Sequence, residues 1–285
     1  MRLLSRVLGK LIGQSVVQES NPKTMQILLR EYYKEMQQNG RQAPVIASTG
    51  FSAYSQSDED GLLLFVFSLI GEGKRVCVEM ASGYPIGANT TNLICNWNWS
   101  GYLFEGNERL AGRARAFFSQ SRDTWLYPPS VIHTWLSREN VNEVMAREGL
   151  SGPIDLLCID VDGMDYWLWK EINVVTPRVV VIEYANFWPA SKSVTVPYKK
   201  DFVRSSTHPD YFGCSLLALE RLGAEKGYRL VGCNKYGFNA IFLQEDLAIR
   251  ELPTATVEEC LSLPHPLRSQ MTRLKAIESL PWLEV

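Results

Sequence analysis

The 285-residue sequence has no long hydrophobic run and no excess of charge of either sign. Its longest apolar stretch, 62–70, is far shorter than the roughly 20 residues that a membrane-spanning helix needs. With 29 basic and 31 acidic side chains, the chain lacks the positive field that would hold a polyanion. These absences predict a protein without a transmembrane helix whose main partner is not a nucleic acid.

Closely paired cysteines are missing as well. The six cysteines stand singly, without the spacing of a zinc site, and several lie within apolar runs. They are Cys77, Cys95, Cys158, Cys214, Cys233 and Cys260. Reduced thiols in a protein core are typical of a cytoplasmic protein, which is the location we expect.

The N-terminus lacks the unbroken apolar stretch of a secretory signal, because Arg2, Arg6 and Lys10 interrupt it. Its apolar residues instead fall on one stripe of a predicted helix. Such a helix can pack on its own domain, lie on a membrane surface or dock on another subunit, including a second copy of the chain. The sequence leaves these alternatives open, and we assign residues 1–45 to an N-terminal helical extension.

Residues 46–250 alternate between short β-rich runs and helical stretches, as expected when helices cover both faces of a parallel sheet. Strands are predicted at 75–79, 101–105, 130–134, 154–160, 179–183, 228–233 and 238–243. The short link 234–237 favours a hairpin between the last two. The fold class is therefore α/β: a Rossmann-like, doubly wound, mostly parallel sheet of about seven strands that ends in an antiparallel hairpin. Residues 251–285 are predicted to form a tail of loops and one helix.

Four of the predicted strands end in an acidic residue, namely Glu79, Glu105, Asp160 and Glu183. In doubly wound sheets, ligands bind beyond the carboxyl ends of the strands, so these acids mark a candidate site. The small-residue turn after Glu79 lets backbone approach a ligand closely, but it lacks the glycine fingerprint that cradles a pyrophosphate. The pattern favours a cofactor without phosphates.

Glu105 lies at about the offset from the first strand at which Rossmann-type folds place a carboxylate on the ribose hydroxyls. Alternatively, it stabilises the dipole of the helix that follows. Asp160 begins a run with Asp162 and Asp165, whose mutual repulsion requires a cation, a basic group or water. Asp160 and Glu183 can converge as a hard-cation site, whereas Asp162 and Asp165 fit a helix cap equally well.

The segment 186–214 has no convincing helix or strand period and holds many aromatic and basic side chains. Long structureless loops in compact domains are commonly functional, so we predict a substrate lid. His208 within it is the candidate general base, because a neutral imidazole accepts a hydroxyl proton near physiological pH. The alternative is a solvated loop histidine.

Several motifs, in the right order between about residues 51 and 246, resemble those of the FkbM-type methyltransferases. They are the acidic motif at 54–60, the turn motifs at 78–83 and 88–90, the second-strand motif at 99–107, and Cys-Ile-Asp-Val-Asp-Gly at 158–163. The resemblance implies a Rossmann-like methyltransferase that uses S-adenosylmethionine. It also implies a small-molecule acceptor, methylated on a hydroxyl group of a sugar or natural-product-like compound. The stretch 84–87 departs from the family's second Asp-Gly element.

Carried over by position, the resemblance implies that Ser82 and Gly83 line the methionine end of the cofactor together with Glu79. It gives Glu105 to the ribose and places Asp160 at the methyl-transfer site, as a catalytic residue. The full cofactor-binding set is Glu79, Ser82, Gly83, Asn89, Thr90, Glu105, Gly106, Asn107 and Asp160. Related sugar O-methyltransferases hold magnesium between acids that match Asp160 and Glu183, so the resemblance admits Mg²⁺ as a further cofactor.

Two other functions compete with this one. An NAD-dependent oxidoreductase can use the same sheet, although the missing glycine fingerprint and the terminal hairpin count against it. A non-catalytic scaffold could keep the fold and join a membrane-associated assembly through the N-terminal helix. Binding of NAD or of S-adenosylmethionine distinguishes these alternatives.

Overall fold

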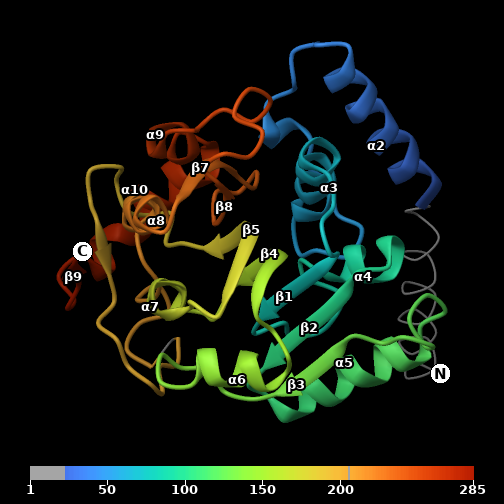
Figure 1. Cartoon of the computed structure of the whole chain (residues 1–285). Helices are drawn as coiled ribbons and strands as arrows, with labels where there is room; N and C mark the ends of the chain where they lie inside the picture. The colour runs from blue at the N-terminus through green and yellow to red at the C-terminus, as the bar shows by residue number, and fades with distance from the viewer. Residues whose placement is uncertain (1–22, 205) are drawn as a thin grey trace, which may run out of the picture.

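Seven short, largely apolar segments form a mixed sheet in the computed structural model, which describes residues 23–204 and 206–285 (Figure 1). The strands are β1 (Val76–Met80), β2 (Ser100–Glu105), β3 (Ser130–His133), β4 (Gly152–Ile159), β5 (Val175–Glu183), β7 (Tyr228–Cys233) and β8 (Asn239–Gln244). Their order is β3-β2-β1-β4-β5-β8-β7. The first five are parallel, and β8 runs antiparallel to both β5 and β7. The winding direction therefore reverses between β1 and β4, where doubly wound sheets bind ligands.

Helices cover both faces of this sheet (Figure 1). They are α2 (Lys23–Gln38), α3 (Glu59–Ile70), α4 (Thr91–Trp97), α5 (Glu108–Gln120), α6 (Val141–Arg147), α7 (Asp165–Glu171), α8 (Leu216–Glu225), α9 (Val257–Leu261) and α10 (Pro264–Ile277). Successive strand residues enter opposite cores, since Leu156 packs with the α3 and α4 side and Leu157 with the α7 and α8 side. Strands buried on both faces explain why the central segments are continuously apolar rather than alternating.

The predicted α/β fold class is confirmed, and each of the seven predicted strands corresponds to one observed strand. The predicted hairpin is β7 and β8, whose turn contains Gly237 at φ 60°. The apolar stretch 62–70 lies in α3, which is buried along nearly its whole length. No helix in the described part of the chain is long and apolar enough to cross a membrane. The predicted amphipathic stripe near the N-terminus falls outside the described residues.

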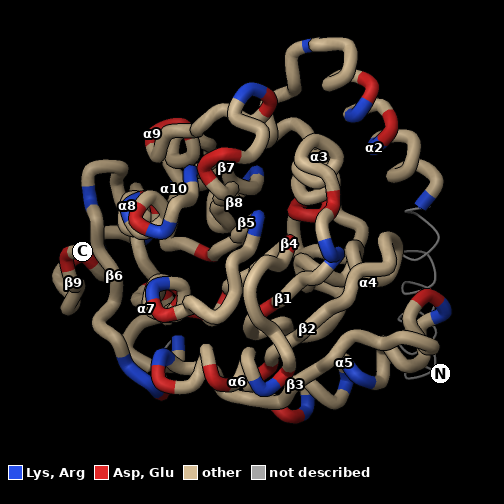
Figure 2. The backbone as a smooth tube through the Cα atoms, viewed as in Figure 1, with Lys and Arg blue, Asp and Glu red and all other residues tan. Residues whose placement is uncertain are grey.

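The tail differs from its prediction. It forms two helices, α9 and α10, and a short strand β9 (Leu283–Glu284) that pairs with β6 (Val194–Thr195). Thr256 and Glu259 close a capping box at the start of α9, and Pro264 occupies the first turn of α10. Pro264 therefore begins a helix, a position that tolerates proline. Figure 2 shows Lys and Arg interspersed with Asp and Glu along the backbone.

Candidate functional site

Two adjoining cavities open at the carboxyl ends of the parallel strands. The larger has a volume of about 570 Å³ and lies over the ends of β1, β4 and β5. The smaller, of about 390 Å³, lies beyond the ends of β2 and β3. Ala81, Glu105, Asp162 and Arg204 line both cavities. The fold therefore places one continuous binding region where the sequence predicted a ligand.

Glu79 shapes the wall of the larger cavity. Its buried carboxylate accepts hydrogen bonds from the backbone N–H groups of Asn89 (2.7 Å) and Thr90 (3.0 Å) and from the Thr90 hydroxyl. Burial raises the pKa of Glu79 to about 7. Asn89 and Thr90, both predicted cofactor residues, thus hold Glu79 and are held by it.

Glu105 joins the loops that follow β1 and β2. One carboxylate oxygen accepts from the Gly83 N–H and the other from the Asn107 N–H, each at 2.7 Å. Gly83 has φ 61°, the left-handed region that glycine adopts readily. Asn107 itself caps α5 by accepting from Arg109 N and Leu110 N. Glu105 thus contacts the start of α5 through the Asn107 N–H, as the alternative interpretation anticipated, and it also lines both cavities.

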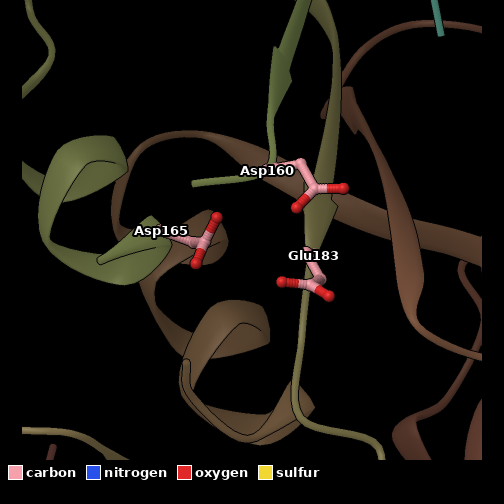
Figure 3. Close-up of side chains that lie close together, drawn as sticks. All are labelled: Asp160, Asp165 and Glu183. Atoms are coloured by element: carbon pink, nitrogen blue, oxygen red, sulfur yellow. The ribbon is translucent and has the colours of Figure 1, made fainter. Parts of the chain in front are cut away.

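Three carboxyl groups meet beyond β4 and β5, and we call Asp160, Asp165 and Glu183 the acid cluster (Figure 3). One oxygen from each lies within 4.8 Å of the others. Burial raises the pKa of Asp160 to about 6 and that of Asp165 to about 7, and it raises the pKa of Glu183 well above its ordinary range. Because burial disfavours ionisation and the like charges repel one another, the protonated form of Glu183 is favoured near neutral pH and its pKa is raised.

Asp165 and Arg204 constrain the cluster from its two sides. Asp165 accepts hydrogen bonds from Val161 N (2.8 Å) and Gly163 N (2.9 Å), so it fixes the loop before α7 as the alternative reading anticipated. The guanidinium of Arg204 lies 2.6 Å from Asp162 and 3.7 Å from Glu183. Its positive charge offsets part of the repulsion among these acids.

Polar atoms without a protein partner gather at the larger cavity. Within the described part of the chain, Ser82 Oγ, Glu183 Oε2 and Asn239 Oδ1 are buried and make no hydrogen bond. All three residues line this cavity. Because a buried unsatisfied polar atom is costly, such a group beside a cavity indicates a ligand or water that completes it.

The smaller cavity has mainly apolar walls. Trp135, Leu136, Val161 and Phe202 line it, together with Gly106 and Asn107 from the predicted cofactor set. The Trp135 indole N–H donates to the carbonyl of Lys200 at 3.0 Å, which orients the ring. These lining residues come from separate loops, so no local pattern in the sequence predicted the smaller cavity.

The segment 186–214 contributes Arg204 to the site, but its histidine lies elsewhere. His208 is not among the described residues that line these two cavities, and its Nδ1 accepts from the Asp210 N–H at 3.1 Å. Two residues of α10, His265 and Arg273, line the larger cavity instead. Their contribution was missed because they lie in the tail, which the sequence separated from the sheet. A histidine between two prolines at a helix start was the available signal.

No protein-family model matches the sequence, and no curated protein matches it. Solved structures are similar to it at low identity. The N-terminal domain of EvdMO1 with SAH bound is 13% identical, covering 75% of this chain and 95% of that one, with a TM-score of 0.45. The glycopeptide N-methyltransferase MtfA complexed with sinefungin is 10% identical over 70% and 94% of the two chains, with a TM-score of 0.40.

A third similar structure is the magnesium protoporphyrin IX methyltransferase (ChlM) from Synechocystis PCC 6803 with bound SAM. It is 12% identical, covers 60% of this chain and 69% of that one, and has a TM-score of 0.33. The strand order and register of this chain define its Rossmann-like fold.

Proposed function

We propose that this chain is an S-adenosylmethionine-dependent methyltransferase that methylates a hydroxyl group of a small molecule, such as a sugar or natural product. The observation that carries the proposal is the pair of joined cavities at the topological switch point, with Glu105 between them and the acid cluster at one end. The sheet ends in the antiparallel pair β7 and β8, with β8 next to β5. The proposal assigns the smaller cavity to adenine and the larger to methionine and acceptor.

Each end of the cofactor meets residues suited to it. Trp135 and Phe202 offer flat apolar surface to adenine, and Glu105 offers carboxylate oxygens to the ribose hydroxyls. The larger cavity presents five acidic residues and two arginines. This negative balance suits a ligand that carries a sulfonium and an ammonium group.

Asp160 is the residue that takes the acceptor's proton. Its pKa of about 6 leaves it ionised near neutral pH, while burial raises the pKa of the neighbouring Glu183 and favours its protonated form. Methyl transfer breaks the sulfur–carbon bond and forms an oxygen–carbon bond, and the hydroxyl proton passes to the Asp160 carboxylate. The larger part of the rate enhancement comes from aligning the two reactants within one enclosed cavity.

The acid cluster also fits a divalent cation. Carboxylate oxygens are the ligands that Mg²⁺ prefers, and the unpartnered Glu183 Oε2 offers a further donor atom. A bound cation would offset the charge of the carboxylates and lower the pKa of a coordinated hydroxyl. We therefore propose Asp160 and Glu183 as its principal ligands, with Asp165 behind them. Turnover that is insensitive to a chelator would exclude this part of the proposal.

Calorimetric titration tests the central proposal directly. We expect S-adenosylhomocysteine and S-adenosylmethionine to bind and NAD not to bind. Binding of NAD alone would establish the oxidoreductase alternative, and binding of neither would favour the scaffold. Incubation of a metabolite extract with methyl-labelled S-adenosylmethionine then identifies the acceptor as the compound that gains the label.

A further inference from the structure

The acidic motif at 54–60 reaches the cavity through one buried glutamate. Glu59, at the first position of α3, is 1% exposed. Its Oε1 accepts from Asn234 Nδ2 at 2.7 Å and from Asn239 Nδ2 at 3.0 Å, and its Oε2 accepts from Ser57 N at 3.1 Å. The helix start is thereby tied to both ends of the β7–β8 turn.

These contacts fix the orientation of the Asn239 amide. A carboxylate only accepts hydrogen bonds, so the Asn239 nitrogen must face Glu59. The opposite atom, Oδ1, is then left without a protein partner. Asn239 is 3% exposed and lines the larger cavity. Glu59, which binds the opposite atom of the amide, therefore holds the acceptor atom Oδ1 in place.

Asn239 stands directly opposite Glu183 in the antiparallel β5–β8 pair. Directly opposite residues of such a pair project from the same face with Cβ atoms about 5 Å apart. Glu183 Oε2 is the other unpartnered oxygen at this place. The two strands therefore present two neighbouring hydrogen-bond acceptors to one cavity.

We infer that Asn239 and Glu183 select an acceptor molecule that presents two adjacent hydrogen-bond donors, a vicinal diol, and that Glu59 is the positioning residue for Asn239. One hydroxyl donates to Asn239 and its neighbour donates to Glu183, beside the Asp160 carboxylate. A molecule with a single hydroxyl leaves one of the two buried acceptors unsatisfied. A molecule with a carboxylate there places its own acceptor oxygens next to those of the protein, which is unfavourable. This inference rests on the proposed function, because it assigns the acceptor end of the same site.

Direct binding tests the inference independently of methyl transfer. Ligand-observed NMR measures the affinity of the full chain, saturated with S-adenosylhomocysteine, for cis-1,2-cyclohexanediol and for cyclohexanol. Since one additional hydrogen bond contributes about 1 kcal/mol, we expect the diol to bind roughly 5- to 10-fold tighter. Equal affinity, or no binding of the diol, would overturn the inference without reference to any variant.

Variants then locate the discrimination. Asn239→Ala and Asn239→Leu, which lack the acceptor oxygen, should bring the diol-to-monool ratio close to one while S-adenosylhomocysteine affinity is unchanged. Glu59→Gln should lower the ratio as well, because an amide at 59 can donate and lets Asn239 invert. Gln56→Ala is the matched control, since it removes an amide from the same cavity and should keep the wild-type ratio.

The two proposals fail in different ways. A wild-type ratio in both folded Asn239 variants would refute the role of Asn239, and a wild-type ratio in Glu59→Gln would refute its positioning role. Loss of discrimination in Gln56→Ala as well would show that the ratio reports general damage and would also overturn the assignment. Selective diol binding without S-adenosylhomocysteine binding would instead refute the methyltransferase and leave the diol site standing.

Discussion

Two groups of three acids, one at the start of α3 and one beyond β4 and β5, are satisfied differently. At the start of α3, Asp58, Glu59 and Asp60 form what we call the α3 clamp. Asp60 Oδ2 alone accepts three backbone N–H groups, from Ala53, Tyr54 and Ser55, at 2.6 to 2.8 Å. Asp60 Oδ1 and, in the acid cluster, Glu183 Oε2 have no hydrogen-bond partner among the described residues, but Glu183 lines the larger cavity and Asp60 is not among its lining residues.

This comparison distinguishes acidic residues that stabilise the fold from acidic residues that form a functional site. A carboxylate oxygen that accepts several backbone N–H groups contributes to the fold and has little capacity left for a ligand. A carboxylate that faces other carboxylates destabilises the fold unless something positive arrives, so its retention in the fold indicates a site. Substitutions in the two groups test this division.

Substitution Asp160→Asn should abolish the chemistry without harming the fold. Removing a positioned general base typically costs 10²- to 10⁴-fold in turnover. The same change removes a charge from the acid cluster, so we expect the free energy of unfolding to stay equal or to rise. Labelled methyl transfer and urea denaturation provide the two readouts. Asp162→Asn, in the same loop but exposed and paired with Arg204, is the control and should cost less than about tenfold.

The reverse pattern is expected in the α3 clamp. Asp60→Ala leaves three backbone N–H groups without their acceptor and should lower the free energy of unfolding by about 3 kcal/mol. Asp60→Asn keeps one carbonyl oxygen for them and should cost clearly less. Urea denaturation measures both variants. A fully stable Asp60→Ala protein would show that the division between the two groups is mistaken.

The same division explains which elements and site residues could be predicted from the sequence. Strands and acidic strand ends were predictable, because buried apolar runs and the residues that terminate them are local properties. Glu105 and Asp160 were found in that way. The α3 clamp was visible only as a motif, since the donors to Glu59 lie on the β7–β8 hairpin, far along the chain.

Residues brought in by long-range packing could not be predicted. Asn239 faces Glu183 because β8 inserts between β5 and β7, and one sequence does not specify that pairing. His265 and Arg273 reach the cavity because α10 folds back across the sheet edge. His208 was predicted from the chemistry of its side chain alone. The sequence does not show where that side chain lies relative to the cavities. The prediction that it acts as general base is tested by His208→Ala, which should leave turnover within threefold if Asp160 takes the proton.

Glu105 shares features of the structural acids and of the site acids. Its oxygens accept hydrogen bonds from two backbone N–H groups, and the residue lines both cavities. Glu105→Ala should weaken S-adenosylhomocysteine binding by about 1–3 kcal/mol, the range for hydrogen bonds to a charged group. Glu105→Gln retains one acceptor oxygen and should lose less. Calorimetry measures the affinities, and thermal unfolding without ligand reports how much of the loss arises from the loops at Gly83 and Asn107. Wild-type affinity in Glu105→Ala would remove it from the ribose site.

The acid cluster also affects the pH dependence of stability, through the titration of Asp160. Burial raises the pKa of Asp160 to about 6, whereas an unfolded aspartate titrates near about 3.9. Between these values the folded chain binds more protons than the unfolded chain, so this group stabilises the fold at low pH and the stabilisation is lost as pH rises through about 6. One group contributes a slope of at most about 1.4 kcal/mol per pH unit.

Asp160→Asn should therefore flatten the fall in unfolding free energy between about pH 4 and 6, whereas Glu278→Gln on the exposed surface should not. An unchanged slope in Asp160→Asn would mean that the acid cluster is already neutralised in the free protein, and the contrast with the α3 clamp would lose its electrostatic basis.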